Sequence, residues 1–156
     1  MRKTIGRSSN FVQPDPPPQP GGALIFERRF PAINETKNEV LNALLAALQD
    51  CGAIRSENDE VRMRLCLDEA LVNAVMHGSK YNAAKNVSVR AYLDENQWAV
   101  LVEDEGSGFR EEDLPDPDAQ ENLLEESGRG VHLIRTMMDS TSYWNGGRTL
   151  LMTKKR

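Results

Sequence analysis

The segment from Leu65 to Gly78, Leu-Cys-Leu-Asp-Glu-Ala-Leu-Val-Asn-Ala-Val-Met-His-Gly, constrains the fold more than any other part of the chain. It is apolar, rich in helix-forming residues and free of proline and internal glycine, so it predicts a largely buried helix. The segment nevertheless carries Glu69 and Asn73, which would lie about 40° apart, one turn from each other on the same helical face. This pair needs a partner, because an unpaired charge is costly to bury.

Two kinds of partner fit this pair. A metal ion, or a water held beside one, would satisfy both the carboxylate and the carboxamide. Alternatively, the carboxylate pairs with Arg62 or Lys80, and the carboxamide bonds to neighbouring backbone. The preceding Asp68 is expected to pair with Arg64, one turn back on the same helix. The helix alone does not decide between the two readings, and residues further along the chain favour the first.

Composition limits the class of protein. The chain has 156 residues, 39% of them hydrophobic and 28% charged, which is typical of one soluble globular domain with its own core. A net charge of −5 argues against sequence-independent nucleic-acid binding, which depends on Lys and Arg neutralising phosphates. No apolar run approaches the length of a membrane span, and no apolar signal core begins the chain, so we expect no membrane association and a cytoplasmic location. Cys51 and Cys66 are expected to be buried free thiols.

The first 22 residues differ in composition from the rest. Residues 1–22 contain five of the eight prolines and end in Gly21 and Gly22. Such a segment buries too little apolar surface to order itself, so we expect a disordered, flexible tail. A polyproline ligand for a partner protein is the alternative. The folded domain is therefore expected to cover residues 23–156.

Within 23–156, hydrophobic periodicity predicts a strand, two helices, two strands, a loop, a helix and two strands. The expected strands cover residues 23–30, 87–93, 98–102, 142–145 and 148–153. The expected helices cover 35–51 (with Asn34 as its N-cap), about 56–77, and 131–138. This order predicts an α+β two-layer sandwich, with helices on one face of a mixed, mostly antiparallel sheet.

A second motif, Asp104-Glu105-Gly106-Ser107-Gly108, follows the third expected strand. Its two glycines let the backbone turn tightly and approach a ligand closely. Asp104, at the end of the strand, can accept a hydrogen bond from an exocyclic amine and so fix a purine. An ordinary β-turn with an acidic first residue is the alternative.

A third motif, Gly128-Arg129-Gly130, precedes the last expected helix. Free backbone N–H groups, the positive end of the helix dipole and a guanidinium together form a plausible phosphate site. An ordinary glycine-containing loop is the alternative here. The preceding acidic segment 110–127 is expected to be a mobile loop, either simply solvated or a docking surface for a basic partner.

Three motifs follow one another in the chain: Glu-x-x-x-Asn on a helix, Asp-x-Gly-x-Gly after a strand, and Gly-x-Gly opening a helix. In this order they resemble the nucleotide-binding boxes of the GHKL (Bergerat-fold) ATPase superfamily. More narrowly, residues 68–78 and 128–134 resemble the bacterial anti-sigma-factor serine/threonine kinases. The resemblance covers about residues 23–156. It implies the Bergerat ATP-binding fold, with ATP and Mg²⁺ as ligands.

The resemblance also implies a role for each matched residue. Glu69 matches the base that accepts the proton of an attacking serine or threonine hydroxyl, Asn73 the Mg²⁺ ligand, and Asp104 the adenine-binding aspartate. The remaining positions match the glycines beneath the base, the hinge between lid and helix, and a threonine near the adenine site: Gly106, Gly108, Gly128, Arg129, Gly130 and Thr149.

The function implied is an ATP-dependent protein serine/threonine kinase that phosphorylates an anti-sigma-factor antagonist and alternately binds this antagonist or a sigma factor. A homodimer through residues 23–50 is expected on the same ground. One alternative is a nucleotide-binding, partner-switching module with little or no kinase activity. Another is the catalytic domain of a two-component histidine kinase, which is disfavoured because residues 1–22 cannot supply a helical dimerisation segment with a phosphoacceptor histidine.

Overall fold

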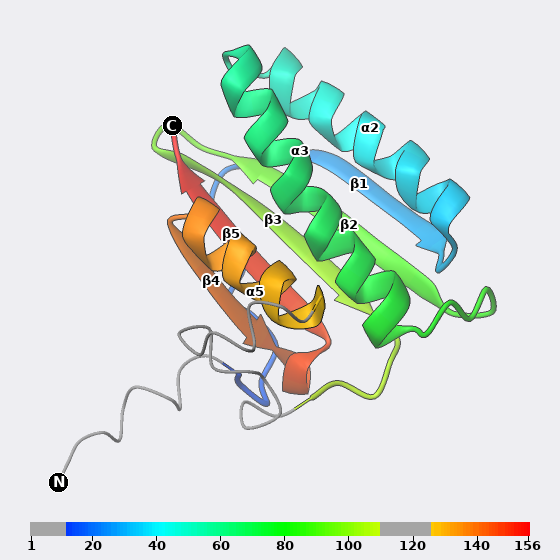
Figure 1. Ribbon diagram of the computed structural model, residues 1–156. Coiled ribbons are helices and arrows are strands. Elements are labelled where there is room, and N and C mark those ends of the chain that lie inside the picture. Colours follow the sequence, from blue (N-terminus) through cyan, green and yellow to red (C-terminus); the bar gives the residue numbers. More distant parts are fainter. Residues whose placement is uncertain (1–11, 110–125) are drawn as a thin grey trace, which may run out of the picture.

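In the described part of the chain, the alternating and helical patterns of the sequence form one sheet and three helices (Figure 1). The computed structural model describes residues 12–109 and 126–156, with the backbone alone at 126–129. The strands are β1 (Ala23–Pro31), β2 (Asn86–Leu93), β3 (Gln97–Asp104), β4 (Ser140–Trp144) and β5 (Thr149–Lys155). The helices are α2 (Asn34–Asp50), α3 (Glu57–Val72) and α5 (Glu126–Met137), with a π-helical turn η1 (Asn73–Gly78) and a 3-10 turn η3 (Asn145–Gly147).

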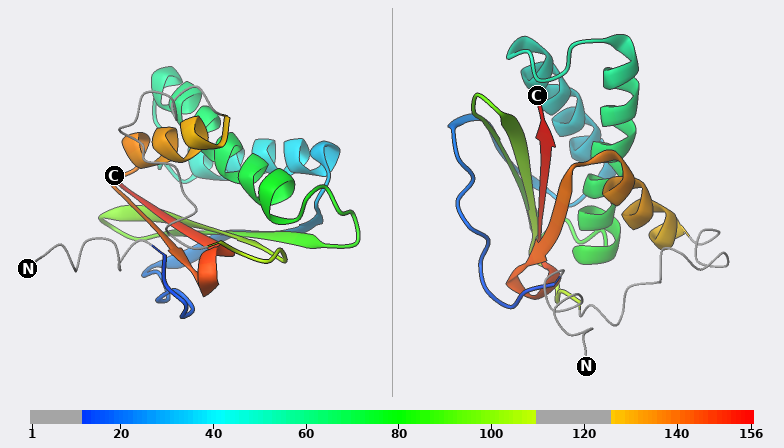
Figure 2. Two further views of the ribbon diagram at one scale, coloured as in Figure 1. Left: turned by 60° about the horizontal axis from the view of Figure 1, so that its bottom comes forward. Right: turned by 90° about the vertical axis from the view of Figure 1, so that its left-hand side faces the viewer.

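The strands form a single sheet in the order β1-β2-β3-β5-β4. Neighbouring strands pair antiparallel, and a parallel bridge joins Val12 to Tyr143. The three helices all pack on one face of this sheet, as the views in Figure 2 show. The predicted α+β two-layer sandwich is therefore confirmed. No helix in the described part of the chain is long and apolar enough to cross a membrane.

The core lies between the helices and the sheet. Every second residue of β2 faces the helices, so Val87, Val89 and Ala91 are fully buried. The apolar stripe predicted for the first helix is also buried, and it consists of Val40, Leu41, Leu44, Leu45 and Leu48. Burial raises the pKa of the Cys66 thiol to about 12, so this cysteine stays protonated and acts as a small apolar residue.

The start of α2 differs from the prediction. Asn34 is the first helical residue rather than the cap, and Ile33 precedes it in an extended conformation with no side-chain cap. The hydroxyl of Thr36 instead donates to the carbonyl oxygens of Pro31 (2.8 Å) and Ile33 (3.2 Å). A hydroxyl inside the first turn thus connects the helix to the strand before it.

The predicted ion pair between Asp68 and Arg64 is wrong. Asp68 Oδ1 instead accepts a 2.6 Å hydrogen bond from Lys37 Nζ of α2, and Arg64 contacts Glu60 and Asn42. Lys37 is only 6% exposed, so its ammonium group needs the nearest carboxylate, while Arg64 can be satisfied at the surface. This pair of a buried lysine and a partly exposed aspartate fastens α2 to α3.

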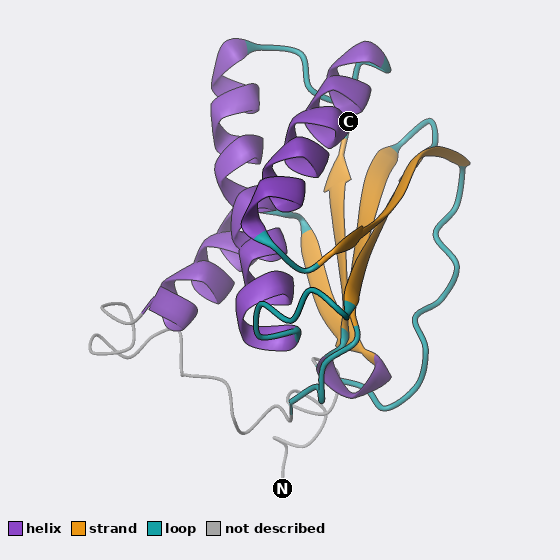
Figure 3. Cartoon of the chain, turned by 90° about the vertical axis from the view of Figure 1, so that its right-hand side faces the viewer, coloured by secondary structure: helices purple, strands orange, loops and turns teal. Residues whose placement is uncertain are grey.

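The segment before β1 also differs from the expected tail. Residues 12–22 run along the face of the sheet opposite the helices (Figure 3) and contact the chain at residues 143–146. β4 is an edge strand, and its backbone groups bind this segment without requiring much apolar burial. The expectation for residues 1–11 lies outside the described residues, as does that of a mobile loop at 110–125.

Candidate functional site

A cavity of about 180 Å³ opens between the C-terminal end of α3, the adjoining ends of β3 and β5, and α5. Small and apolar side chains make up much of its lining: Ala70, Ala74, Val102, Phe109, Val131, Tyr143 and Leu150. Polar groups come from Asn73, His77, Asp104 and Arg148. An apolar slot with a few convergent polar groups is the usual form of a small-molecule site.

Asp104 is the last residue of β3 and lines this cavity, and two glycines lie next to its carboxylate. Its Oδ1 atom accepts a 2.7 Å hydrogen bond from the Gly106 amide. A methyl group on Gly78 would lie 2.4 Å from the carboxylate carbon, and one on Gly106 would lie 2.0 Å from the Gly78 carbonyl oxygen. Neither position therefore accepts a side chain. Gly78, which the sequence predicted only as a helix end, belongs to the site.

Burial raises the pKa of Asp104 from 3.8 to about 6, against the opposing effects of the Gly106 amide and the Arg148 and Lys85 charges. At neutral pH the group is thus a carboxylate in mostly apolar surroundings, where an added hydrogen-bond donor stabilises it strongly. An exocyclic amine of a flat heterocycle is such a donor.

Glu69 and Asn73 converge where α5 crosses α3. A methyl group on Gly130 would lie 2.7 Å from Glu69 Oε2 and 3.6 Å from both terminal atoms of the Asn73 side chain. The structure therefore brings Glu69, Asn73 and Gly130 together, and a side chain at position 130 would displace the Glu69 carboxylate. Asn73 begins the π-helical turn η1, a distortion that occurs often at functional sites.

One wall of the cavity is formed by Gly108 and Phe109. Gly108 has φ +77°, and a methyl group there would lie 2.2 Å from the Gly146 carbonyl oxygen. The Phe109 amide donates to that same oxygen at 2.9 Å. The Phe109 ring packs edge-on against Tyr143 with centroids 4.8 Å apart. The wall thus depends on the turn at 145–147.

Thr149 does not line this cavity. Its hydroxyl accepts from Asn145 Nδ2 at 2.8 Å and donates to Glu103 Oε2 at 3.3 Å. Its neighbours Arg148 and Leu150 line the cavity instead, because successive strand residues face opposite sides. Arg148, whose carbonyl oxygen accepts from the Asp104 amide at 2.9 Å, is a site residue that the sequence reasoning missed.

The predicted phosphate site is only partly described. α5 begins at Glu126, so Gly128 lies in its first turn rather than before the helix. The Arg129 side chain lies outside the described residues. Among the described residues, no cluster of three or more His, Cys, Asp or Glu side chains could hold a metal ion.

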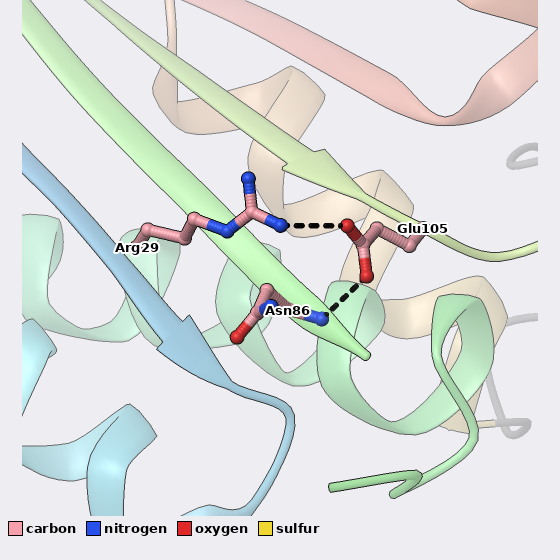
Figure 4. A network of polar contacts seen from close by, with 3 residues as sticks. All are labelled: Arg29, Asn86 and Glu105. Atoms are coloured by element: carbon pink, nitrogen blue, oxygen red, sulfur yellow. Dashed lines mark hydrogen bonds and ion pairs between the residues drawn. The ribbon is translucent and has the colours of Figure 1, made fainter. Parts of the chain in front are cut away.

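A polar network fastens the turn after Asp104 to the sheet (Figure 4). Glu105 accepts a 3.0 Å hydrogen bond from the Arg29 guanidinium and a 2.8 Å bond from the Asn86 amide. These contacts connect the glycine turn to β1 and β2. The network lies outside the cavity, but it restrains the backbone next to Gly106.

Replacing Glu105 by alanine is expected to lower the free energy of unfolding by about 1 kcal/mol, because two exposed charge-assisted contacts are lost. Nucleotide affinity should fall only a few-fold, since Asp104 itself is unchanged. Urea unfolding and calorimetry measure the two effects. Glu95→Ala, at an exposed hairpin position, is the control and should change neither quantity.

An α+β sandwich with a glycine-walled apolar pocket, a partly buried aspartate at its base and a Glu–Asn pair beside it has the features of a purine-nucleotide-binding domain. The comparison with known families agrees: a model described as the histidine kinase-like ATPase domain matches residues 30–154. The chain belongs to this family, and the resemblance to the GHKL superfamily is confirmed.

Three relatives illustrate the similarity. The serine-protein kinase RsbW of Bacillus subtilis (strain 168) is 35% identical over 104 residues, which cover 62% of this chain and 65% of the relative. The anti-sigma F factor of Clostridium perfringens (strain SM101 / Type A) is 33% identical over 102 residues, covering 60% and 70%. The serine-protein kinase RsbW of Staphylococcus aureus (strain Newman) is 30% identical over 139 residues, covering 83% and 85%. The match with the Bacillus subtilis protein thus spans slightly less than two thirds of that protein.

Proposed function

We propose that this chain is an ATP-dependent protein serine/threonine kinase that acts as an anti-sigma regulatory factor, with residues 23–156 as its kinase domain. The observation that carries the proposal is the convergence of Glu69 and Asn73 on Gly130, beside the cavity that ends at Asp104. The names of the relatives, which include serine-protein kinases and an anti-sigma factor, support the same activity.

In this proposal the cavity binds the adenine of ATP. Asp104 accepts a hydrogen bond from the exocyclic amine through the oxygen that the Gly106 amide leaves available. The small side chains Ala70 and Ala74 leave space for the flat base, and Gly108 lets the backbone turn beside it. The base is therefore recognised by shape and by one partly buried acceptor.

The phosphates would extend from the cavity toward the crossing of α3 and α5. Asn73 offers a carboxamide oxygen, a ligand type that suits Mg²⁺, and it lies at the edge of the cavity next to Glu69. When bound, Mg²⁺ supplies neutralisation of the phosphate charge. Gly128, Arg129 and Gly130 lie at the N-terminal end of α5, whose backbone dipole favours an anion.

Glu69 would act as the general base. Its carboxylate, half-buried on the same helical face as Asn73, would accept the proton of a serine or threonine hydroxyl on the partner protein. Positioning and electrostatic stabilisation by the surrounding donors supply most of the rate in phosphoryl transfer. The base adds a smaller factor.

The proposed substrate is a small anti-sigma-factor antagonist, and the alternative binding partner is a sigma factor. A phosphoryl group adds about −1.5 to −2 charge to the antagonist. This chain carries a net charge of −5, so the added charge would favour release of the phosphorylated antagonist. A cytoplasmic location and homodimerisation remain predictions.

Incubation of the purified chain with γ-labelled ATP, Mg²⁺ and a candidate antagonist tests the proposal. Label is expected on serine or threonine of the antagonist, and EDTA should abolish the transfer. Nucleotide binding by calorimetry without any labelled partner would support a partner-switching module instead. Label on histidine would support a histidine kinase.

A further inference from the structure

We propose that residues 12–15, here called the strap, hold the turn at 145–147 and thereby position one wall of the nucleotide cavity. The inference rests on the proposed nucleotide-binding function and assigns a role within the fold to part of the segment that was expected to be a flexible tail. Figures 2 and 3 show the segment leading into β1 on the face of the sheet opposite the helices.

The turn between β4 and β5 needs external support. Asn145, Gly146 and Gly147 have φ values of +54°, +66° and +98°, three consecutive residues in left-handed backbone. This conformation is unfavourable for a residue with a side chain, so Asn145 holds it only when its surroundings compensate. Its side chain donates to Thr149 at 2.8 Å, which restrains the turn from within.

The strap supplies the remaining support. The Asn145 amide donates to the Asp15 carbonyl oxygen at 2.8 Å, and the Gly146 amide donates to that of Gln13 at 2.9 Å. In return the Gln13 amide donates to the Tyr143 carbonyl oxygen at 2.8 Å. Val12 forms the parallel bridge to Tyr143 and packs against the edge of the core. Two turn amides thus have their acceptors in the strap.

The opposite side of the turn contacts the cavity wall. The Gly146 carbonyl oxygen accepts from the Phe109 amide, and a methyl group on Gly147 would lie 2.6 Å from that amide nitrogen. Phe109 packs on Tyr143, and both rings line the cavity. A single turn therefore separates the strap from the nucleotide site, and a displaced turn would carry Phe109 with it.

Pro14 helps to explain how a segment with few apolar side chains binds the edge of the sheet. Pro14 lies between the two residues whose carbonyl groups accept from the turn, and it needs no hydrogen-bond acceptor of its own. Its ring fixes φ, which reduces the conformational entropy that the strap loses when it binds. The strap is thus suited to permanent binding through its backbone, not through buried apolar area.

Two full-length variants test this proposal. Gln13→Pro removes the N–H that donates to Tyr143, and Val12→Asp places a charge where a side chain packs on the core edge. Gln19→Pro, at an exposed position of the same segment, is the control. We expect the Asn145 and Gly146 amides to exchange at least about tenfold faster by NMR in both variants, and the Kd for ADP to rise about three- to tenfold, the equivalent of one lost hydrogen bond.

The control should match the parent chain in both measurements. Unchanged amide exchange in both variants would show that the strap does not hold the turn, whatever the nucleotide result. Faster exchange with an unchanged Kd would show that the strap does not position the cavity. A parent chain that binds no ADP would overturn the proposed function and the coupling, while amide exchange would still decide whether the strap holds the turn.

Discussion

Asp104→Asn is expected to weaken ATP binding by about 100-fold or more while making the ligand-free chain more stable. The introduced carboxamide would keep its oxygen toward the Gly106 amide, because that amide donates at 2.7 Å in the parent chain. Its NH₂ group would then face the exocyclic amine of adenine, so two donors would meet where a carboxylate accepted a charge-assisted hydrogen bond. Losing such a bond and leaving donors unpaired costs several kcal/mol.

The gain in stability follows from the pKa of Asp104. Burial raises this pKa from 3.8 to about 6 in the folded chain. The ionised group therefore destabilises the fold fully above pH 6, and this effect disappears as the pH falls toward 4. Asp104→Asn should raise the free energy of unfolding by about 1 kcal/mol at pH 8, after allowance for partial solvent screening, and give no such gain at pH 4.

Urea unfolding at the two pH values and calorimetry with ATP measure both effects. Asp94→Asn is the matched control, since Asp94 lies in the β2–β3 turn and its pKa is lowered by hydrogen bonds from the Gln97 and Asn96 amides. This control should lose stability at pH 8, keep ATP affinity, and lose its difference from the parent chain at low pH. Unaltered ATP binding by Asp104→Asn would remove Asp104 from the nucleotide site.

Glu69→Gln is expected to lower the rate of phosphoryl transfer by about 10²- to 10⁴-fold, the usual contribution of a general base. ATP affinity should change less than about threefold, because the carboxamide has the same shape and the close approach to Gly130 is kept. A loss of kcat with little change in binding identifies an interaction that acts in the transition state.

Single-turnover kinetics with labelled ATP and the antagonist measure the chemical step directly. Glu60→Gln, on the same helix and paired with Arg64 at the surface, is the control and should transfer phosphate at the parent rate. A Glu69→Gln variant that retains full activity would assign the base to another residue. Equal losses in the two variants would indicate a general effect on the helix.

Local sequence patterns predicted much of the fold and the positions of several residues around the cavity. The alternating residues of β2 and the apolar stripe of α2 form buried faces, as predicted. The two-residue period of a strand and the 3.6-residue period of a helix depend only on local backbone geometry. The spacing of Glu69 and Asn73 placed them on one helical face for the same reason, and the structure brings both to Gly130. Asp104 lies in the cavity as the strand–turn pattern indicated.

Two errors arose where the answer depends on distant parts of the chain. Thr149 was placed near the adenine, but the register of β5 turns it to the opposite face and puts Arg148 and Leu150 at the cavity. A shift of one residue reverses every side chain of a strand, and the residues alone do not fix that shift. Likewise, helical spacing predicted that Asp68 pairs with Arg64, whereas the packing of α2 against α3 places Lys37 beside it.

The contact between Gly78 and Gly106 has a consequence for ligand choice. Two segments far apart in the chain touch there through their main chains, with no side chain that can rotate to relieve pressure. The cavity lining at Gly78 therefore offers no rotamer change that would make room for a bulkier heterocycle. We therefore expect this part of the site to discriminate among bases by steric exclusion rather than by adjusting its shape.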